Sequence, residues 1–438
     1  FLIIRNQKKN LAIFQFTFIN KNMNFKFIGN AGGIFTGSKG SKILCDPWIV
    51  NGVFEGSWYH YPPLKTKISD IQNVDGIYIS HIHADHYDER YFKFSKDIPL
   101  IILDEGPNFL KKNLIKLGYN NFIEVKNDQT VEFKEFNLTM YKPFTKHTYE
   151  ESLLGNLIDS ALVLNDQKTT AINFNDNTPD EKACLFLKKK FKQIDLAMFN
   201  YNAAGPYPSC FDNLNIHEKK KEHDRILTRN FEYLCKIIPA LEPKSVLPFA
   251  GAYILGGKLS HKNDYLATTT WDECADYLKE KLEMKTNIFC LRENQTFDIL
   301  KQIQLDEYKR IDLNEMKDYI QSIKDHKYDY EMDDEPEIQK LSNDTELAAK
   351  GLLTKIAKFN LNIKSDVFIE VNEKQIPILR GVEDGRKLYC KMDNKLLRRI
   401  LDRKSHWNNA EIGAHITFKR YPNKMEPDVH TIMSFFYL

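Results

Sequence analysis

Two spacings of apolar side chains divide the first 321 residues into predicted strands and helices. Short apolar runs and alternating runs predict strands at 24–30, 41–50, 75–80, 99–104, 121–144, 160–166, 170–176, 194–200 and 244–251. Apolar residues at helical spacing predict helices at 106–119, 179–192 and 224–241. Because strands dominate early and helices come between the later strands, the pattern indicates a mixed α/β fold rather than an all-α or all-β one.

A glycine-rich stretch, "AGGIFTGSKG" at 31–40, joins the first two predicted strands. A phosphate-binding loop would need a helix directly after the glycines, so that the helix N-terminus meets the phosphate. Another strand follows here, and the stretch is therefore predicted to be a tight turn.

The chain has 438 residues, which is too long for one ordinary hydrophobic core and predicts two domains. Residues 23–321 hold the strand-rich pattern of the larger domain. Residues 322–346 are acidic and weakly apolar, which is typical of a linker or an exposed connection, and residues 347–438 predict a smaller α+β domain. Residues 1–22 lack an initiator methionine and precede a strand-like restart at Met23, so we expect them to be a non-native or disordered extension.

Charge and composition narrow the functional classes only a little. The formal net charge is +2 and the pI is about 8.0, so the whole chain gives no argument for binding nucleic acid or an anionic membrane. No apolar run reaches the roughly 18 residues that a membrane span needs. The seven cysteines are scattered, without CxxC or CxH pairs, which suits free thiols in a reducing cytoplasm. We therefore expect a cytoplasmic protein.

Four potential metal ligands follow the predicted strand 75–80: His81, His83, Asp85 and His86. Two histidines at alternate positions of an extended chain point the same way, and the Asp-His pair after them can face a second metal ion. Imidazole nitrogen and carboxylate oxygen suit Zn, Fe or Mn. A solvated, hydrogen-bonded histidine loop is the alternative, but four such residues within six positions favour a metal site.

The motif "HIHADH" (81–86) is similar to the HxHxDH signature of the metallo-β-lactamase fold. This resemblance implies an αββα sandwich with one or two metal ions at the strand ends, held also by residues of later loops. His147 and Asp176 match such positions, and Asp176 would be the ligand that bridges two metal ions. A surface histidine is the alternative for His147, and a turn or helix cap is the alternative for Asp176.

The last ligand that the fold implies is a histidine at the end of the strand 244–251, but Phe249 and Ala250 stand there. Either the site has five ligands, or a nearby residue replaces the missing one, for which His261 is the best candidate. The resemblance also implies catalytic roles for Asp85 and Asp176, with Asp85 acting on the proton of a metal-bound water.

Several longer stretches resemble a narrower group, the CMP-N-acetylneuraminate hydroxylase and UDP-N-acetylmuramate hydroxylase family. They are "CDPWIVNGVFEGSWYHYPP" (45–63), "YISHIHADH" (78–86), "NFNDNTP" (173–179), "AAGPYPSCF" (203–211), "LPFAGAY" (247–253) and "SHWNNAEIGAHITFKRYPN" (405–423). They are spread over most of the chain, and "HWNNAEIG" is the more specific part. The resemblance implies hydroxylation of an N-acetyl group to N-glycolyl on a sugar nucleotide, with oxygen and with electrons from a Rieske domain.

A Rieske domain needs CxH and CxxH ligand pairs, and the printed chain has neither. The resemblance then implies either a separate Rieske or ferredoxin electron donor or a different reaction. Two divalent metal ions are expected in both cases. Iron with these ligands suits oxygen chemistry, whereas zinc or manganese suits hydrolysis of an ester, amide or phosphodiester on a similar sugar-nucleotide or glycan precursor.

The same stretches contain candidate substrate contacts: Trp58, Tyr207, Ser209, Asn408, Asn409 and Glu411. The aromatic-rich stretch around Trp58 could stack on a sugar or base, or belong to the core. Tyr207 and Ser209 offer hydroxyls from a stiff Gly/Pro loop, with loop packing as the alternative. The three C-terminal residues are expected to complete the pocket as the smaller domain docks, and a structural hydrogen-bond network is their alternative.

Overall fold

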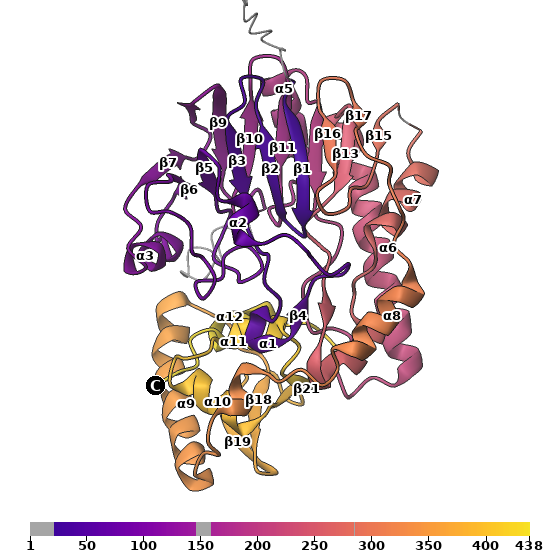
Figure 1. Ribbon diagram of the computed structural model, residues 1–438. Helices are drawn as coiled ribbons and strands as arrows, with labels where there is room; N and C mark the ends of the chain where they lie inside the picture. Colours follow the sequence, from indigo (N-terminus) through magenta and orange to yellow (C-terminus); the bar gives the residue numbers. More distant parts are fainter. Residues whose placement is uncertain (1–21, 146–158, 284) are drawn as a thin grey trace, which may run out of the picture.

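The computed structural model describes residues 22–145, 159–283 and 285–438. Two mixed β-sheets form the upper part of the molecule (Figure 1). The first has the order β17 (Ile303–Gln304), β16 (Thr296–Asp298), β1 (Asn24–Gly29), β2 (Gly32–Thr36), β3 (Lys42–Cys45), β5 (Gly76–Tyr78), β6 (Leu100–Asp104) and β7 (Phe122–Lys126). The second has the order β15 (Asn287–Ile288), β13 (Ser245–Pro248), β12 (Leu196–Phe199), β11 (Thr170–Asn173), β10 (Ala161–Asn165), β9 (Phe136–Tyr141) and β8 (Thr130–Phe133).

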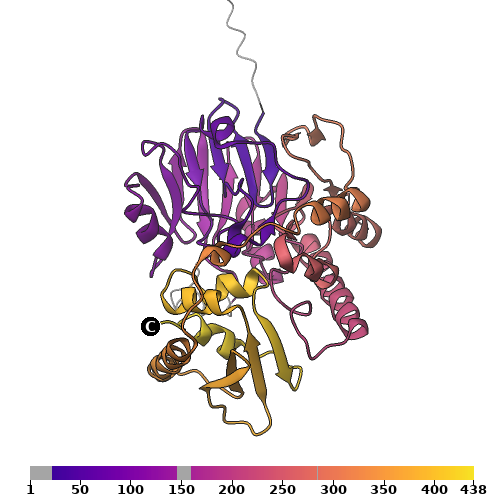
Figure 2. The same cartoon turned by 60° about the horizontal axis from the view of Figure 1, so that its bottom comes forward.

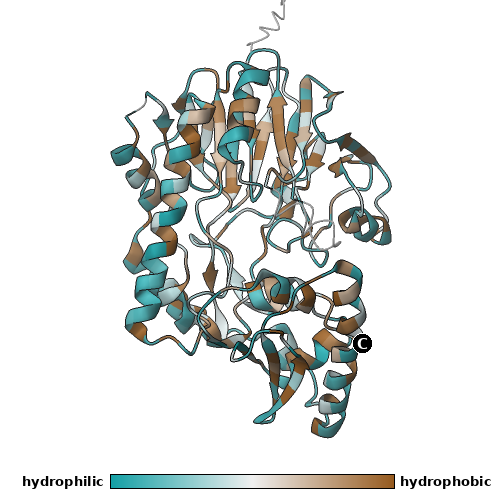
Figure 3. Cartoon of the chain, turned by 180° about the vertical axis from the view of Figure 1, so that it is seen from behind, coloured by the Kyte–Doolittle hydropathy of each residue, from teal (hydrophilic) through white to brown (hydrophobic). Residues whose placement is uncertain are grey.

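Helices cover the outer faces of both sheets. The helices α2 (Ile68–Ile71) and α3 (Phe109–Lys116) share a buried apolar cluster with the first sheet. The helices α5 (Glu181–Phe191), α6 (Ile216–Leu241) and α7 (Trp271–Lys281) pack into the large core that includes the second sheet. Figure 3 shows hydrophobic residues concentrated in the strands and hydrophilic ones on the long outer helix. The arrangement confirms the predicted αββα sandwich.

The start of α6 is set by its cap rather than by its apolar stripe. The Asn215 side chain accepts a hydrogen bond from the Glu218 N–H, and the Glu218 side chain accepts one from the Asn215 N–H. This capping box satisfies two backbone donors that a helix start leaves open. The helix therefore begins at Ile216, earlier than the apolar spacing from 224 predicted.

One segment of the first sheet differs from the pattern-based prediction. The stretch 31–40, predicted to be a tight turn, contains the strand β2, whose Gly33 pairs with Phe27 of β1. Gly33 has no room for a side chain, since a Cβ there would lie 2.2 Å from the Phe25 ring. The glycines thus serve close packing inside a strand, which a turn-based interpretation does not anticipate.

The parallel strands of both sheets decide where the site lies. In the first sheet β3, β5 and β6 run parallel, and in the second β11, β12 and β13 run parallel. The carboxyl ends of parallel neighbours lie at one edge of a sheet, and the loops after them start from that edge.

The smaller C-terminal unit holds a sheet of order β19 (Lys374–Leu379), β18 (Asp366–Val371), β20 (Lys387–Lys391) and β21 (Thr417–Tyr421). Its helices are α9 (Ile338–Phe359), α10 (Asn394–Leu401), α11 (Trp407–Ile412) and α12 (Pro427–Met433). The helix α9 begins inside the segment expected to be a linker, where Tyr328 and Tyr330 are also buried. That segment is therefore partly core rather than an exposed connection.

Shorter elements lie between the two units: α1 (Val53–Gly56), β4 (Trp58–Tyr59), β14 (Ile254–Leu255), η1 (Gly257–Tyr265), α8 (Leu313–Ser322) and η2 (Asp329–Met332). One apolar cluster runs from these elements into the C-terminal unit. Backbone hydrogen bonds join them as well, since the Phe418 N–H donates to the Cys210 carbonyl over 2.8 Å and the Asp212 N–H donates to the Phe418 carbonyl over 2.8 Å. Figure 2 shows the C-terminal unit packed under the sandwich.

Among the residues that the structure describes, no helix combines the length and the apolarity that crossing a bilayer requires.

Candidate metal centre

The motif residues 81–86 form the loop directly after β5, at the sheet edge where β3 also ends. The loop turns back sharply, because the N–H groups of His86 and Tyr87 both donate to the His83 carbonyl, over 3.0 and 2.8 Å. Asp176 reaches the same place from the loop after β11 of the facing sheet. The two sheets thus bring together residues that are far apart in the sequence.

His81, His83 and Asp176 form a group that could hold a metal ion, since one ligand atom of each lies within 4.8 Å of the others. His81 Nε2 is 2.8 Å from His83 Nδ1 and 3.7 Å from Asp176 Oδ2. Two imidazole nitrogens and a carboxylate oxygen are the donors that Zn, Fe and Mn accept.

His86 and Asp85 face Asp176 from the other side. His86 Nε2 lies 3.4 Å from Asp85 Oδ2 and 3.5 Å from Asp176 Oδ2. Within the described part of the chain this buried nitrogen has no hydrogen-bond partner, although buried polar atoms normally have one. Asp176 Oδ2 therefore lies within 4 Å of both His81 Nε2 and His86 Nε2.

Ser80 and Asp46 contact the outer nitrogens of these imidazoles, and the sequence-based prediction missed both. Ser80 Oγ lies 2.9 Å from His81 Nδ1 and 3.1 Å from His86 Nδ1. Asp46 Oδ2 lies 3.1 Å from His86 Nδ1, and Asp46 Oδ1 accepts the Ser80 N–H over 2.8 Å. The Asp46 carboxylate favours the proton on His86 Nδ1 and leaves Nε2 for a metal ion, while Ser80 helps to orient both rings. The sequence shows only that Asp46 and Ser80 each follow a predicted strand, and the pairing of these strands is seen in the structure.

Two asparagines orient the carboxylates. Asn30 donates to Asp85 Oδ2 over 3.1 Å, and Asn200 donates to Asp176 Oδ1 over 2.9 Å. The second contact leaves the other oxygen of Asp176 directed at the imidazoles. Neither asparagine has a local motif that would mark it in the sequence.

The electrostatics of the group favour a cation. Burial lowers the pKa of His81 well below its usual value. Burial also acts to lower the pKa of His86, but the nearby carboxylates, Asp85 foremost, outweigh it and raise that pKa well above the usual value. A divalent ion would supply positive charge where the folded chain otherwise favours a proton on His86.

The remaining predicted ligands differ in their outcome. His147 lies outside the described residues. His261 is exposed in η1 with its Nδ1 2.9 Å from the Lys258 carbonyl oxygen, and it does not join the group. Asp159, which the sequence-based prediction did not single out, brings its Oδ1 to 3.8 Å from His81 Nε2. It is a further carboxylate close to the group of His81, His83 and Asp176.

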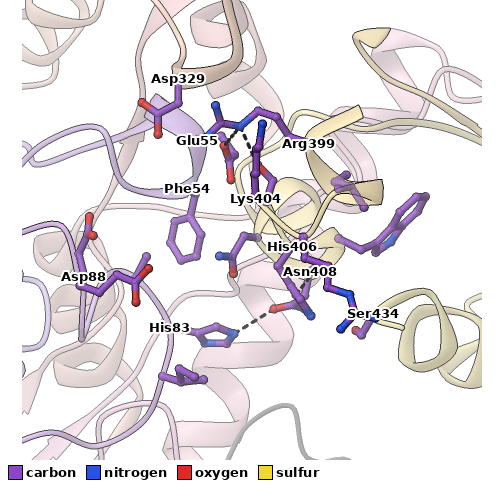
Figure 4. Close-up of a pocket in the computed structure, with 18 of the residues that line it drawn as sticks. Phe54, Glu55, His83, Asp88, Asp329, Arg399, Lys404, His406, Asn408 and Ser434 are labelled. Carbon is purple, nitrogen blue, oxygen red and sulfur yellow. Dashed lines mark hydrogen bonds and ion pairs between the residues drawn. The ribbon is translucent and has the colours of Figure 1, made fainter. Parts of the chain in front are cut away.

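A cleft of about 450 Å³ opens beside His83, between the 81–86 loop and the helices α10 and α11. Figure 4 shows that both units line it. Asn408 Oδ1 lies 3.1 Å from His83 Nε2. Because an amide oxygen only accepts, His83 Nε2 carries the proton, and its Nδ1 is left for a metal ion. Asn409 lines the same cleft.

The other predicted substrate contacts are occupied by contacts within the chain. Trp58 is 2% exposed and stacks on Tyr253, with ring centroids 3.4 Å apart, so it belongs to the core. Tyr207 donates to Glu222 over 2.9 Å, away from the residues that line the cleft.

Ser209 and Glu411 are buried and have partners as well. The Ser209 hydroxyl donates to the Lys262 carbonyl over 2.6 Å. Glu411 Oε1 lies 2.5 Å from His430 Nδ1. These contacts agree with the alternatives given above, which are loop packing for Ser209 and a structural hydrogen-bond network for Glu411.

No family model matches the chain. The chain is 31% identical over 210 residues to the "Putative Rieske 2Fe-2S iron-sulfur protein" of Mycolicibacterium smegmatis, which covers 45% of this chain and 39% of that protein. It is 22% identical over 282 residues to the cytidine monophosphate-N-acetylneuraminic acid hydroxylase of Pongo pygmaeus, covering 60% of this chain and 44% of that one. The chain thus spans less than half the length of these relatives. Among solved structures, CmlA, a diiron beta-hydroxylase from Streptomyces venezuelae, matches 64% of this chain and 54% of its own with 16% identity and a TM-score of 0.44.

Proposed function

Because this chain is a metallo-β-lactamase-fold protein related to the CMP-N-acetylneuraminic acid hydroxylases, we propose that it hydroxylates the N-acetyl group of a nucleotide-linked amino sugar or a related glycan precursor. A Rieske or ferredoxin centre would deliver the electrons. The observation that carries the proposal is the place of Asp176 Oδ2, 3.7 Å from His81 Nε2 and 3.5 Å from His86 Nε2. A carboxylate between two histidine groups, without thiolates, suits a pair of iron ions.

The proposal gives each residue of the group a task. His81, His83 and Asp176 would hold one ion, and Asp85 and His86 would hold the other together with the shared Asp176. A bound iron pair would supply the oxygen chemistry. The chain itself orients the ligands through Ser80, Asp46 and the asparagines, and it offers a cleft beside His83 for the acyl group.

Asp85 is suited to a proton transfer in either reaction. Its burial acts to raise the pKa of the carboxyl, but His86 outweighs burial and the pKa is lowered, so Asp85 remains ionised. An ionised carboxylate at the metal pair can accept a proton from a group bound there. This residue alone does not distinguish oxygenation from hydrolysis.

Hydrolysis is the second candidate function, because the same donors suit zinc and a base stands beside them. The substrate would be an ester, an amide or a phosphodiester of similar size. The identity of the metal separates the two candidates.

The experiment is to purify the protein without added metal and measure its metal content, then follow oxygen from ¹⁸O₂ into CMP-N-acetylneuraminate in the presence of reduced ferredoxin. We expect about two iron ions per chain and a product that is heavier by one ¹⁸O atom. Zinc in the protein together with product that contains no ¹⁸O would overturn the hydroxylase proposal in favour of hydrolysis. Asp176→Ala serves as the control that lacks the shared ligand.

A further inference from the structure

Two consecutive residues with side chains adopt the left-handed backbone conformation at one end of the cleft. Phe54 has φ 53° and ψ 66°, and Glu55 has φ 60° and ψ 23°. This region is disfavoured for residues other than glycine, asparagine and aspartate, and strain of this kind concentrates at ligand sites. In Figure 4 Glu55 and His83 lie at different ends of the cleft, with Phe54 between them. The turn thus places the Glu55 carboxylate in the cleft that contains His83.

The Glu55 carboxylate is buried but incompletely paired. The residue is 9% exposed, and within the described part of the chain its Oε2 has no hydrogen-bond partner. The Arg399 Nε is 3.6 Å from that oxygen and donates instead to the Ser405 hydroxyl over 3.1 Å. Burial raises the pKa of the Glu55 carboxyl. Ser405 and Arg399 act to lower that pKa, so the carboxylate is not isolated, but its Oε2 can still accept a hydrogen bond from a ligand.

The C-terminal unit holds the strained turn in place. His415 Nε2 donates to the Phe54 carbonyl over 2.9 Å, and the Trp58 Nε1 donates to the Ile412 carbonyl over 3.2 Å. Gly413 approaches so closely that a Cβ there would lie 2.9 Å from the Phe54 oxygen. Arg399, beside Glu55, also belongs to this unit. The feature is therefore built from both units rather than left over in a loose loop.

We propose that Glu55, with Arg399 and Ser405, forms a recognition subsite for hydroxyl groups of a neutral sugar, at the end of the cleft away from His83. The carboxylate accepts hydrogen bonds, whereas the guanidinium donates. A hydroxyl donates and accepts, so it satisfies both. A phosphate is an anion and would be repelled by the Glu55 carboxylate. The inference rests on the proposed function only in taking this cleft as the substrate cleft.

The test uses the full chain and measures binding of N-acetylglucosamine and of inorganic phosphate by ligand-observed NMR and calorimetry. Glu55→Gln keeps the shape and removes the charge, and it should weaken binding of N-acetylglucosamine about tenfold, the usual effect of losing a charge-assisted hydrogen bond. Glu89→Gln is the matched control, because Glu89 also lines the cleft but is exposed. That variant should bind the saccharide as the wild type does. An unchanged melting temperature of Glu55→Gln shows that the loss is local.

Three results would overturn the subsite: no saccharide binding by the wild type, equal binding by the wild type and Glu55→Gln, or an equal loss in Glu89→Gln. Phosphate that binds the wild type in competition with the saccharide, and more tightly, would overturn the assignment to hydroxyl groups. The outcome is separate from that of the hydroxylase proposal. If the protein is a zinc hydrolase that binds the saccharide through Glu55, the subsite proposal stands and the hydroxylase proposal fails. If it is an iron protein whose saccharide binding does not depend on Glu55, the hydroxylase proposal stands and the subsite proposal fails.

Discussion

Replacing Asn408 by leucine should lower the metal affinity at one of the two proposed positions, although Asn408 itself is not a proposed ligand. Asn408 stands on α11 of the C-terminal unit and accepts the His83 Nε2–H over 3.1 Å. Leucine has nearly the same shape but cannot accept a hydrogen bond. The variant loses a net hydrogen bond of about 1 kcal/mol and leaves a buried donor open, for a total of about 1.5–3 kcal/mol. At about 1.4 kcal/mol per factor of ten, metal affinity at the His83 position should fall about 10- to 100-fold.

The assay is competition of Co²⁺ between the protein and a chromophoric chelator, together with the visible spectrum of the Co²⁺-loaded protein. The spectrum reports the geometry around the ion, so it responds to a reoriented His83. Asn408→Asp keeps an acceptor and should restore most of the affinity. Asn409→Leu changes a neighbour that lines the same cleft and has no described contact to His83, so it should leave the affinity and the spectrum unchanged. Wild-type affinity and spectrum in Asn408→Leu would refute the reasoning.

Three further outcomes can be measured. Asp176→Ala should lose one metal ion and turnover, because two cations about 3.5–4 Å apart would repel each other without a shared carboxylate. Asp85→Asn should retain more metal than Asp176→Ala, while its turnover falls steeply. Two ions per chain in Asp176→Ala, measured by elemental analysis, would show that Asp176 is not shared. A chain ending at Asp344 should lose substrate affinity and expose the apolar surface around Trp58, and full affinity and turnover in that chain would contradict a shared site. Burial lowers the pKa of His415 to about 3, whereas the value in the unfolded chain is about 6.5, so the stability that depends on neutral His415 is complete above pH 6.5 and is lost as the pH falls toward 3, by up to about 1.4 kcal/mol per pH unit. The free energy of unfolding of His415→Gln, measured with denaturant, should therefore depend less on pH in that range than that of the wild type. An unchanged pH dependence would contradict this prediction.

The parts of the site that could be predicted from the sequence depend on local spacing. The 81–86 motif follows a short apolar strand, and His81 and His83 are close in the sequence, so local spacing is enough to bring their rings together. Asp176 was predicted from the resemblance to the fold, together with its place after a predicted strand. Asp46 also follows a strand, but nothing in the sequence shows that its strand pairs next to the one before His81. Its contact with His86 is a property of sheet order.

The predictions that did not anticipate the structure concern packing. The aromatic stretch around Trp58 has the composition of a stacking surface, yet its indole lies in the core against Tyr253. The strand β2 has the glycine-rich composition of a turn, because the Phe25 ring lies too close to Gly33 to leave room for a side chain there. The type of a residue determines which contacts it can make. Tertiary packing selects among them, and only the assembled sheets show which are made.

Glu55 shows how the C-terminal unit would contribute to the proposed site. The backbone of Phe54 and Glu55 would relax in an isolated loop, since the left-handed conformation at two consecutive residues is readily adopted only by glycine. The His415 hydrogen bond and the close approach of Gly413 hold the Phe54 carbonyl in place. The same unit contacts His83 through Asn408. One docking event therefore sets both the ligand geometry at the metal end of the cleft and the carboxylate at the other end, so a mutation at the docking surface should change metal affinity and substrate affinity together.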